Sequence, residues 1–287
     1  LFFYNRWLLD ALFRLAADNL IYTAKRRGLR VGIFGALHTY GRRLNWHPHV
    51  HLSVTAGGLD EQGVWKNLSF HKEALRRRWM WLVRDYLLGQ PLSQLTMPPQ
   101  LAHIHGESDW RRLILTAGGQ HWHIHLSKKT ENGRKTVNYL GRYLKKPPIS
   151  GSRLAHYTCG ATLSFTYLDH RTQTYQQETL SQADMLRRVV QHIPEKHFRM
   201  IRYFGFLANR VCGKYLPKVY EALKMATPGP VPKLYFAQMA KAFLNVDPFR
   251  CVLCGARMVY TAAISGLTVQ GLVLNAQAIA QMRYVKP

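Results

Sequence analysis

The first 27 residues carry apolar side chains at helical spacing. Between residues 4 and 27 these side chains are Trp7, Leu8, Ala11, Leu12, Leu15 and Tyr22, and the run ends in the basic cluster Lys25-Arg26-Arg27 before Gly28. Apolar residues three and four apart line one side of a helix, and a glycine is a common stop signal. The pattern predicts a helical lead-in that leads into the core.

Two strand-like runs follow the lead-in. Residues 31–40 and 49–55 are apolar and β-branched enough for strands, the polar residues 41–46 make a turn between them, and Gly57-Gly58 closes the second run. Residues 70–88 then show an apolar stripe between arginines, which is typical of a helix with one buried face.

The rest of the chain alternates between both kinds of pattern. We expect a connector with a short helix over 91–118, a strand over 121–126, a charged turn over 128–135, a helix over 136–144 that ends at Pro147-Pro148, strands over 154–157 and 161–168, helices over 180–225 broken at Pro194 and Pro217, and a linker over 227–232. The predicted class is α+β, with a lead-in at 1–30, a core at 31–175, a helical region packed on it at 176–226, and a linker and tail at 227–287.

Charge narrows the choice of partner. The chain of 287 residues has 40 Lys and Arg against 15 Asp and Glu, a net charge of +25. An excess of this size favours a polyanion, and nucleic acid in particular, because basic side chains bind the phosphate backbone. The sequence contains no amphipathic anchor and no apolar run of about 20 residues, so nothing in it predicts that the protein binds or spans a membrane.

The cysteines and the lack of a visible signal peptide predict a cytoplasmic protein. The four cysteines are irregularly spaced, which does not predict a disulfide framework, and no signal peptide is visible. Since the chain begins with Leu1 rather than Met, we expect that a segment upstream of it is missing.

His49 and His51 are the first candidate site residues. Side chains two apart on a strand point to one face, so both rings would project into one space and could share a metal ion. If residues 31–40 and 48–55 pair as an antiparallel hairpin with His38 opposite His49, His38 becomes a third ligand.

Other residues compete for these roles. His103-Ile104-His105 and His123-Ile124-His125 repeat the spacing, His47 shares the parity of the pair, and His125 and Gln120 are alternative third ligands. Imidazoles suit zinc, nickel or copper, whereas phosphoryl transfer usually uses magnesium or manganese. We expect a divalent ion, with Mg or Mn favoured by the chemistry.

Tyr139 and Tyr143 are the candidate nucleophiles. Four residues apart on a helix, they would share a face and lie about 6 Å apart along the axis. A tyrosine hydroxyl with an ordinary pKa near 10 is a poor nucleophile at neutral pH. It can attack a phosphate only when that phosphate is polarised and cations lie nearby. Arg142, Lys145 and Lys146 could supply these cations, and Arg42 and Arg43 in the polar turn are further candidate DNA contacts.

These motifs, in order, resemble those of the HUH endonucleases, and most closely those of the two-tyrosine transposases of rolling-circle insertion sequences. The resemblance runs from about residue 30 to about residue 212, over Leu37-His38-Thr39-Tyr40-Gly41, Pro48-His49-Val50-His51, Ala56-Gly57-Gly58, Tyr139-Leu140-Gly141-Arg142-Tyr143, Pro147-Pro148-Ile149-Ser150, Ile193-Pro194 and Ile201 to Ala208.

The resemblance implies a central antiparallel sheet of HUH type that carries the histidines and is flanked by helices. It also implies cleavage of single-stranded DNA, at transposon ends and at the target, to a 5′-phosphotyrosine, with a second tyrosine for strand transfer. His49 and His51 match the histidine pair, and Tyr139 and Tyr143 the nucleophiles. His38 matches the third ligand by spacing only. Members of the family usually carry a cysteine-rich zinc domain before the nuclease, and we expect this domain to be missing from the present sequence, which begins at Leu1.

Some features leave alternatives open. A plasmid relaxase or replication initiator would use the same chemistry, and an inactive or truncated nucleic-acid-binding protein would keep only the basic surface. Cys251 and Cys254 resemble half of a zinc site, which needs four ligands. Candidate rings for base stacking are Trp46, Trp110, Trp122 and Tyr157, for most of which core packing is the ordinary role.

Overall fold

A computed structural model gives the fold and divides the chain into two units, Leu1–Thr227 and Pro228–Pro287. It describes residues 1–118, 122–127, 129, 148–149, 154–155, 161–169, 171–229, 234–245, 247–251 and 254–259, with isolated positions at 268, 270, 271 and 274. The mixture of helices with antiparallel sheets confirms the α+β class.

The first unit is built on a three-stranded antiparallel sheet in the order β2-β1-β8. Its strands are β1 (Gly32–Tyr40), β2 (Trp46–Val54) and β8 (Ile201–Gly205). The β1–β2 hairpin forms where the alternating pattern predicted it, although β2 begins at Trp46, earlier than expected.

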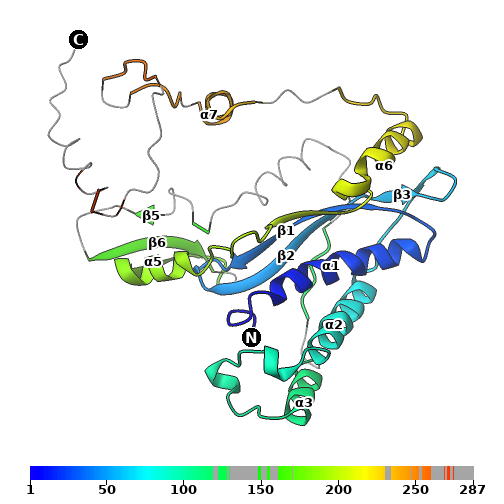
Figure 1. The fold of residues 1–287 in the computed structure, drawn as a ribbon, viewed down its shortest axis with the longest axis horizontal. Coiled ribbons are helices and arrows are strands. Elements are labelled where there is room, and N and C mark those ends of the chain that lie inside the picture. Colours follow the sequence, from blue (N-terminus) through cyan, green and yellow to red (C-terminus); the bar gives the residue numbers. More distant parts are fainter. Residues whose placement is uncertain are drawn as a thin grey trace. The chain divides into compact units, whose positions relative to one another are not determined.

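Helix α1 (Leu8–Lys25) covers one face of this sheet, as Figure 1 shows. Its Leu9, Leu12 and Phe13 pack with Leu37 of β1 in the main core. Gly35 permits this approach, because a β-carbon there would lie 2.4 Å from a Leu52 methyl and 2.9 Å from the Phe13 ring. The odd-numbered residues of β1 therefore face α1, and the even-numbered residues lie on the opposite face of the sheet.

Two further helices extend the core beyond α1. Helix α2 (Lys72–Leu88) packs against α1, and α3 (Glu107–Gly118) packs against α2 (Figure 1). Trp110 is 3% exposed and its indole N–H donates to the Leu87 carbonyl, 3.1 Å away. Short 3-10 turns, Leu92–Gln94 and Pro99–Leu101, connect α2 to α3, in agreement with the expected connector.

The remaining strands and helices form smaller groups. Strands β3 (Gly57–Leu59) and β4 (Trp65–Asn67) pair with each other, and β5 (Leu154–Ala155), β6 (Thr162–Leu168) and β7 (Tyr175–Ser181) form a second antiparallel sheet. Helix α5 (Gln182–Val190) packs on that sheet, α6 (Asn209–Ala222) ends the first unit, and α7 (Phe236–Leu244) belongs to the second.

Several expectations for individual elements were wrong. Residues 122–127 are not a strand, and the region 180–225 is not wholly helical because β8 lies within it and pairs with β1. Pro217 lies inside α6 rather than breaking it. Strands β3, β4 and β7 were not predicted. Within the described part of the chain, no helix is long and apolar enough to cross a bilayer.

Candidate metal centre

The register of the β1–β2 hairpin brings three histidines onto one face of the sheet. His38 pairs with His49, as the hairpin argument predicted, and His51 pairs with Ala36 one step further along. Since side chains alternate along a strand, His49 and His51 point to the same side as His38. This face is opposite the one that α1 covers.

The three rings lie in contact. Ring centroids are 5.5 Å apart for His38 and His49, 4.9 Å for His38 and His51, and 4.8 Å for His49 and His51. One nitrogen from each ring lies within 4.8 Å of the other two. His38 is only 5% exposed, while His49 and His51 are partly exposed. One side of the group is therefore accessible to a substrate.

The hydrogen bond of His49 fixes its tautomer. Its Nδ1 lies 2.8 Å from the backbone oxygen of His47, and a carbonyl oxygen can only accept, so Nδ1 must carry the proton. In the neutral ring Nε2 then keeps a lone pair directed away from that carbonyl. Metal-binding histidines commonly donate their second ring N–H in this way.

The donor chemistry of the group fits a divalent transition ion. Three neutral imidazoles on one side of a hairpin occupy part of a coordination sphere and leave positions for substrate oxygens or water. Among the described residues, His38, His49 and His51 form the one group of histidine, cysteine and carboxylate side chains that could hold an ion. His125 is exposed and not in it, nor is His47.

Tyr40 borders the histidine group. Its ring stacks on His38 at 5.1 Å between centroids, and burial raises the pKa of its hydroxyl to about 12. Tyr40 therefore stays a neutral phenol near neutral pH and is a poor source of a phenolate.

His192 stabilises the hairpin by hydrogen bonds to Thr39 and Leu44. The sequence did not predict this role. Its Nε2 donates to the Leu44 carbonyl at 3.0 Å, so its Nδ1 accepts the hydroxyl proton of Thr39 at 3.1 Å in the neutral ring. Burial lowers the pKa of His192, although the bond to Leu44 opposes that effect. Nothing in the local run Gln191-His192-Ile193-Pro194 signals this role, because it depends on contacts 148 and 153 residues away.

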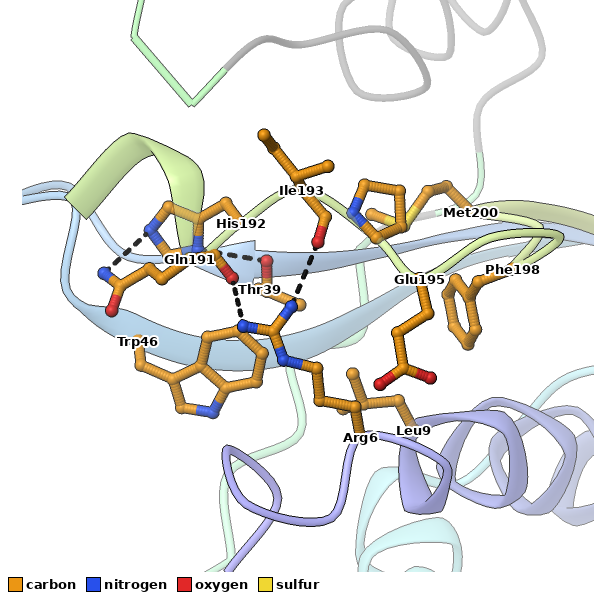
Figure 2. Close-up of a pocket in the computed structure, with 11 residues that line it drawn as sticks. Arg6, Leu9, Thr39, Trp46, Gln191, His192, Ile193, Glu195, Phe198 and Met200 are labelled. Carbon is orange, nitrogen blue, oxygen red and sulfur yellow. Dashed lines mark hydrogen bonds between the residues drawn. The ribbon is translucent and has the colours of Figure 1, made fainter. Parts of the chain in front are cut away.

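Figure 2 shows the cavity that His192 and Thr39 line, with the hydrogen bond between them. Arg6 donates to the carbonyls of Gln191 and Ile193, and its guanidinium lies 5.2 Å from the centre of the Trp46 ring. The Trp46 ring also runs parallel to His192, at 6.0 Å and 5°. These contacts make Trp46 part of the packing behind the hairpin.

The tip of the hairpin is tied to the second sheet. Leu44 is fully buried against Phe165 and Met185. Beside it, Arg43 binds Glu178 of β7 with two hydrogen bonds of 2.9 and 3.2 Å, and Arg188 of α5 binds the same carboxylate at 2.9 Å. The hydrogen bond from Arg43, with support from Arg188, holds the pKa of Glu178 below its usual value.

Arg42 and Arg43, which were predicted to bind DNA, both contact the second sheet. Arg42 donates to the Leu168 carbonyl at 3.1 Å. The side chain of Arg43 is nevertheless 58% exposed, so its outer N–H groups can meet a ligand.

Other predicted residues lie elsewhere or outside the described residues. Trp110 belongs to the core, and Trp122 packs against it. The predicted residues that lie outside the described part of the chain are Tyr139, Tyr143, Arg142, Lys145, Lys146, Gln120 and Tyr157.

Cys251 and Cys254 belong to the second unit, where Cys254 is part of a turn. The Gly255 N–H donates to the Cys251 carbonyl at 2.9 Å, and Gly255 has a φ of +75°, which favours glycine. No third or fourth ligand joins them among the described residues. Zinc at this turn remains a sequence-based expectation.

Fold and site together define an α+β protein with a candidate histidine metal centre on an antiparallel hairpin. Residues 32–214 match the family model Y2_Tnp, described as "Putative transposase", and the chain belongs to this family. No solved structure matches the chain.

Two curated relatives support the family assignment. A Pseudomonas savastanoi pv. phaseolicola protein named "Transposase for insertion sequence element IS801" is 95% identical over 287 residues, which are 100% of this chain and 70% of that protein. "Putative transposase y4qJ" of Sinorhizobium fredii (strain NBRC 101917 / NGR234) is 29% identical over 238 residues, 78% of this chain and 60% of that protein.

Proposed function

We propose that this chain is a transposase that cuts single-stranded DNA at the ends of an insertion sequence and transfers the cut strand through a 5′-phosphotyrosine, as in rolling-circle transposition. The observation that carries the proposal is the group of His38, His49 and His51 on one hairpin, in a member of a transposase family. The IS801 transposase, which is 95% identical, supports the link to an insertion sequence.

The three histidines would hold the divalent ion. They fit it because their donor atoms lie together and because the bond from His49 to the His47 carbonyl prepares one ring for coordination. When bound, such an ion would polarise a phosphoryl oxygen of the substrate as a Lewis acid. We propose magnesium or manganese as the ion, because phosphoryl transfer usually uses one of them, although imidazoles more commonly bind zinc, nickel or copper.

The tyrosines would carry the covalent step. The phenolic oxygen of Tyr139 or Tyr143 attacks the scissile phosphorus and loses its proton, the new bond to phosphorus forms, and the bond from phosphorus to the 3′-oxygen breaks. The departing 3′-oxygen takes up a proton and becomes a free 3′-hydroxyl. In a second transesterification a free 3′-hydroxyl attacks the phosphotyrosine, the bond from phosphorus to the tyrosine oxygen breaks, and that oxygen takes up a proton, which returns the strand to DNA without outside energy. The other tyrosine would be available to cut a second strand in the same way.

Cations would hold the strand during this step. The net charge of +25 favours phosphate contacts along the chain. Arg142, Lys145 and Lys146 are next to the tyrosines in sequence, and Arg42 and Arg43 are at the hairpin tip. Their role would be to neutralise phosphates of the bound strand and the charge that develops during attack.

A covalent capture assay tests the proposal. The full chain is incubated with labelled single-stranded oligonucleotides from the element's ends, with Mn²⁺, Mg²⁺ or chelator, and resolved under denaturing conditions. We expect a metal-dependent covalent band that His49→Ala abolishes and that Tyr139→Phe or Tyr143→Phe reduces. Tight binding without any band in wild type would instead indicate a protein that only binds nucleic acid.

A further inference from the structure

A second cavity, of about 520 Å³, opens at the tip of the β1–β2 hairpin. It is lined by Arg43, Asn45, Trp46, Arg188 and Gln191. Four of these five side chains are polar or charged, and Trp46 and Gln191 also line the cavity of Figure 2. Pockets of a few hundred cubic ångströms are the size that takes small ligands or parts of larger ones.

The charges around this cavity favour an anion. Arg43 and Arg188 share one carboxylate, that of Glu178. Arg42 and Asp169 are further charged groups near the tip, through the bond of Arg42 to Leu168 and the electrostatic effect of Asp169 on Arg43. Arg6 also contacts two lining residues, Trp46 and Gln191, so arginines outnumber carboxylates around the cavity.

The two guanidinium groups are also held in place with donors to spare. A guanidinium has five N–H donors in a fixed plane. Arg43 uses Nε and Nη2 on Glu178, and Arg188 uses Nη1 on Glu178 and on the Arg43 carbonyl. Two of the five donors of each arginine are thus occupied, which leaves about three of each for a ligand. Arginines that are fixed by a carboxylate lose little freedom when they bind a phosphate.

The cavity lies within reach of a strand bound at the histidines. Trp46 is three residues before His49 on β2, which corresponds to about 10 Å. This is the length of about three nucleotides at 3.4 Å per nucleotide in a stacked strand, and of fewer in an extended one. We propose that the cavity binds one phosphodiester group of the DNA strand that is cut, no more than about three nucleotides from the scissile phosphate. The assignment of that strand rests on the proposed function.

Neighbouring arginines on α5 give a matched test. Arg188 lines the cavity, while the adjacent Arg187 is 75% exposed and pairs with Asp184. Affinity of the full chain for an end-derived oligonucleotide is measured by fluorescence anisotropy at several salt concentrations, with chelator so that no cleavage occurs. Arg188→Gln is compared with Arg187→Gln. Asn45→Asp, which places a negative charge in the cavity at an exposed position, tests the same site without removing a contact to Glu178.

Phosphate mapping identifies the contact. Single phosphates of the oligonucleotide are replaced in turn by neutral methylphosphonates. We expect Arg188→Gln and Asn45→Asp to weaken binding roughly tenfold, the scale of one charge-assisted hydrogen bond, and Arg188→Gln to lower the salt slope by about 0.7. Arg187→Gln should change binding much less. One methylphosphonate should weaken wild type and leave Arg188→Gln unaffected.

Equal losses in Arg187→Gln and Arg188→Gln, with no phosphate coupled to Arg188, would overturn the proposal. So would competition by inorganic phosphate or dTMP at lower concentrations than the oligonucleotide, because the ligand would then be a free phosphate compound. Coupling without a covalent band in the metal assay would refute the nuclease and leave the cavity assignment standing. A covalent band without any phosphate coupled to Arg188 would support the nuclease and refute the cavity assignment.

Discussion

Leu44 should hold the hairpin tip in place through side-chain packing, although its backbone conformation is unfavourable for a residue with a β-carbon. Its side chain is fully buried, and its φ is +58°, in the left-handed region that costs a residue with a β-carbon about 1–2 kcal/mol. Leu44→Ala removes three carbons, worth about 2.4 kcal/mol of transfer free energy at 0.8 per carbon, and leaves a cavity, so we expect a loss of about 3–4 kcal/mol in the free energy of unfolding.

Glycine should be unusually well tolerated at the same position. Glycine at position 44 removes the strain of the left-handed backbone, which stabilises the folded state, but it gives the unfolded chain more entropy, which destabilises it. Because these effects nearly cancel, the free energy of unfolding of Leu44→Gly should lie within about 1 kcal/mol of that of Leu44→Ala. Leu37 is the matched control, since it is equally buried but lies within β1. There, Gly should be less stable than Ala by about 1 kcal/mol or more.

Urea unfolding followed by tryptophan fluorescence measures all four variants. The reasoning is refuted if Leu44→Ala costs under about 1 kcal/mol, or if Gly is as unfavourable relative to Ala at position 44 as at position 37. The first result would mean that the tip is not held by the contacts of Leu44 with Phe165 and Met185. The second would mean that the left-handed backbone at Leu44 carries no energetic cost.

Two further predictions concern the metal and pH. His49→Ala should lower the Mn²⁺ affinity measured by calorimetry roughly 100-fold or more, because loss of a ligand should cost more than loss of a residue that only hydrogen-bonds to a ligand. His47→Ala is the control, since His47 lies on the same strand but is exposed and outside the group, and it should change the affinity little. Equal losses in the two variants would exclude the hairpin site. Because the pKa of Glu178 is lowered in the folded state, its contribution to stability is present above its ordinary pKa of 4.5 and is lost as pH falls through the lower folded value. Unfolding free energy should therefore fall less steeply below pH 4.5 in Glu178→Gln than in wild type, and parallel curves would show that the pairing with Arg43 and Arg188 adds nothing.

The hairpin with its histidines could be predicted from sequence because the information is local. The two-residue period of His49 and His51 fixes their common face, and a short turn between two strand-like runs leaves little choice of partner for His38. Helices α1 and α2 likewise follow from apolar stripes of the expected period.

What the sequence did not predict depends on distant contacts. Strand β8 has five residues, too few for an alternating pattern to stand out, and its pairing with β1 defines it as a strand. His192 and Arg188 act through the hairpin tip, about 145 residues earlier in the chain. Residues 122–127 have an alternating pattern typical of a strand but pair with no other segment among the described residues.

The most direct test of the central claim is to locate the covalent bond. Wild-type protein is reacted with a single-stranded end oligonucleotide and Mn²⁺, digested with a protease and a nuclease, and the peptide that retains a nucleotide is sequenced by mass spectrometry. The account predicts a 5′-nucleotide on the phenolic oxygen of Tyr139 or Tyr143, and none when His49 is replaced by alanine. Cleaved DNA with a free 5′-phosphate and no modified tyrosine would contradict it.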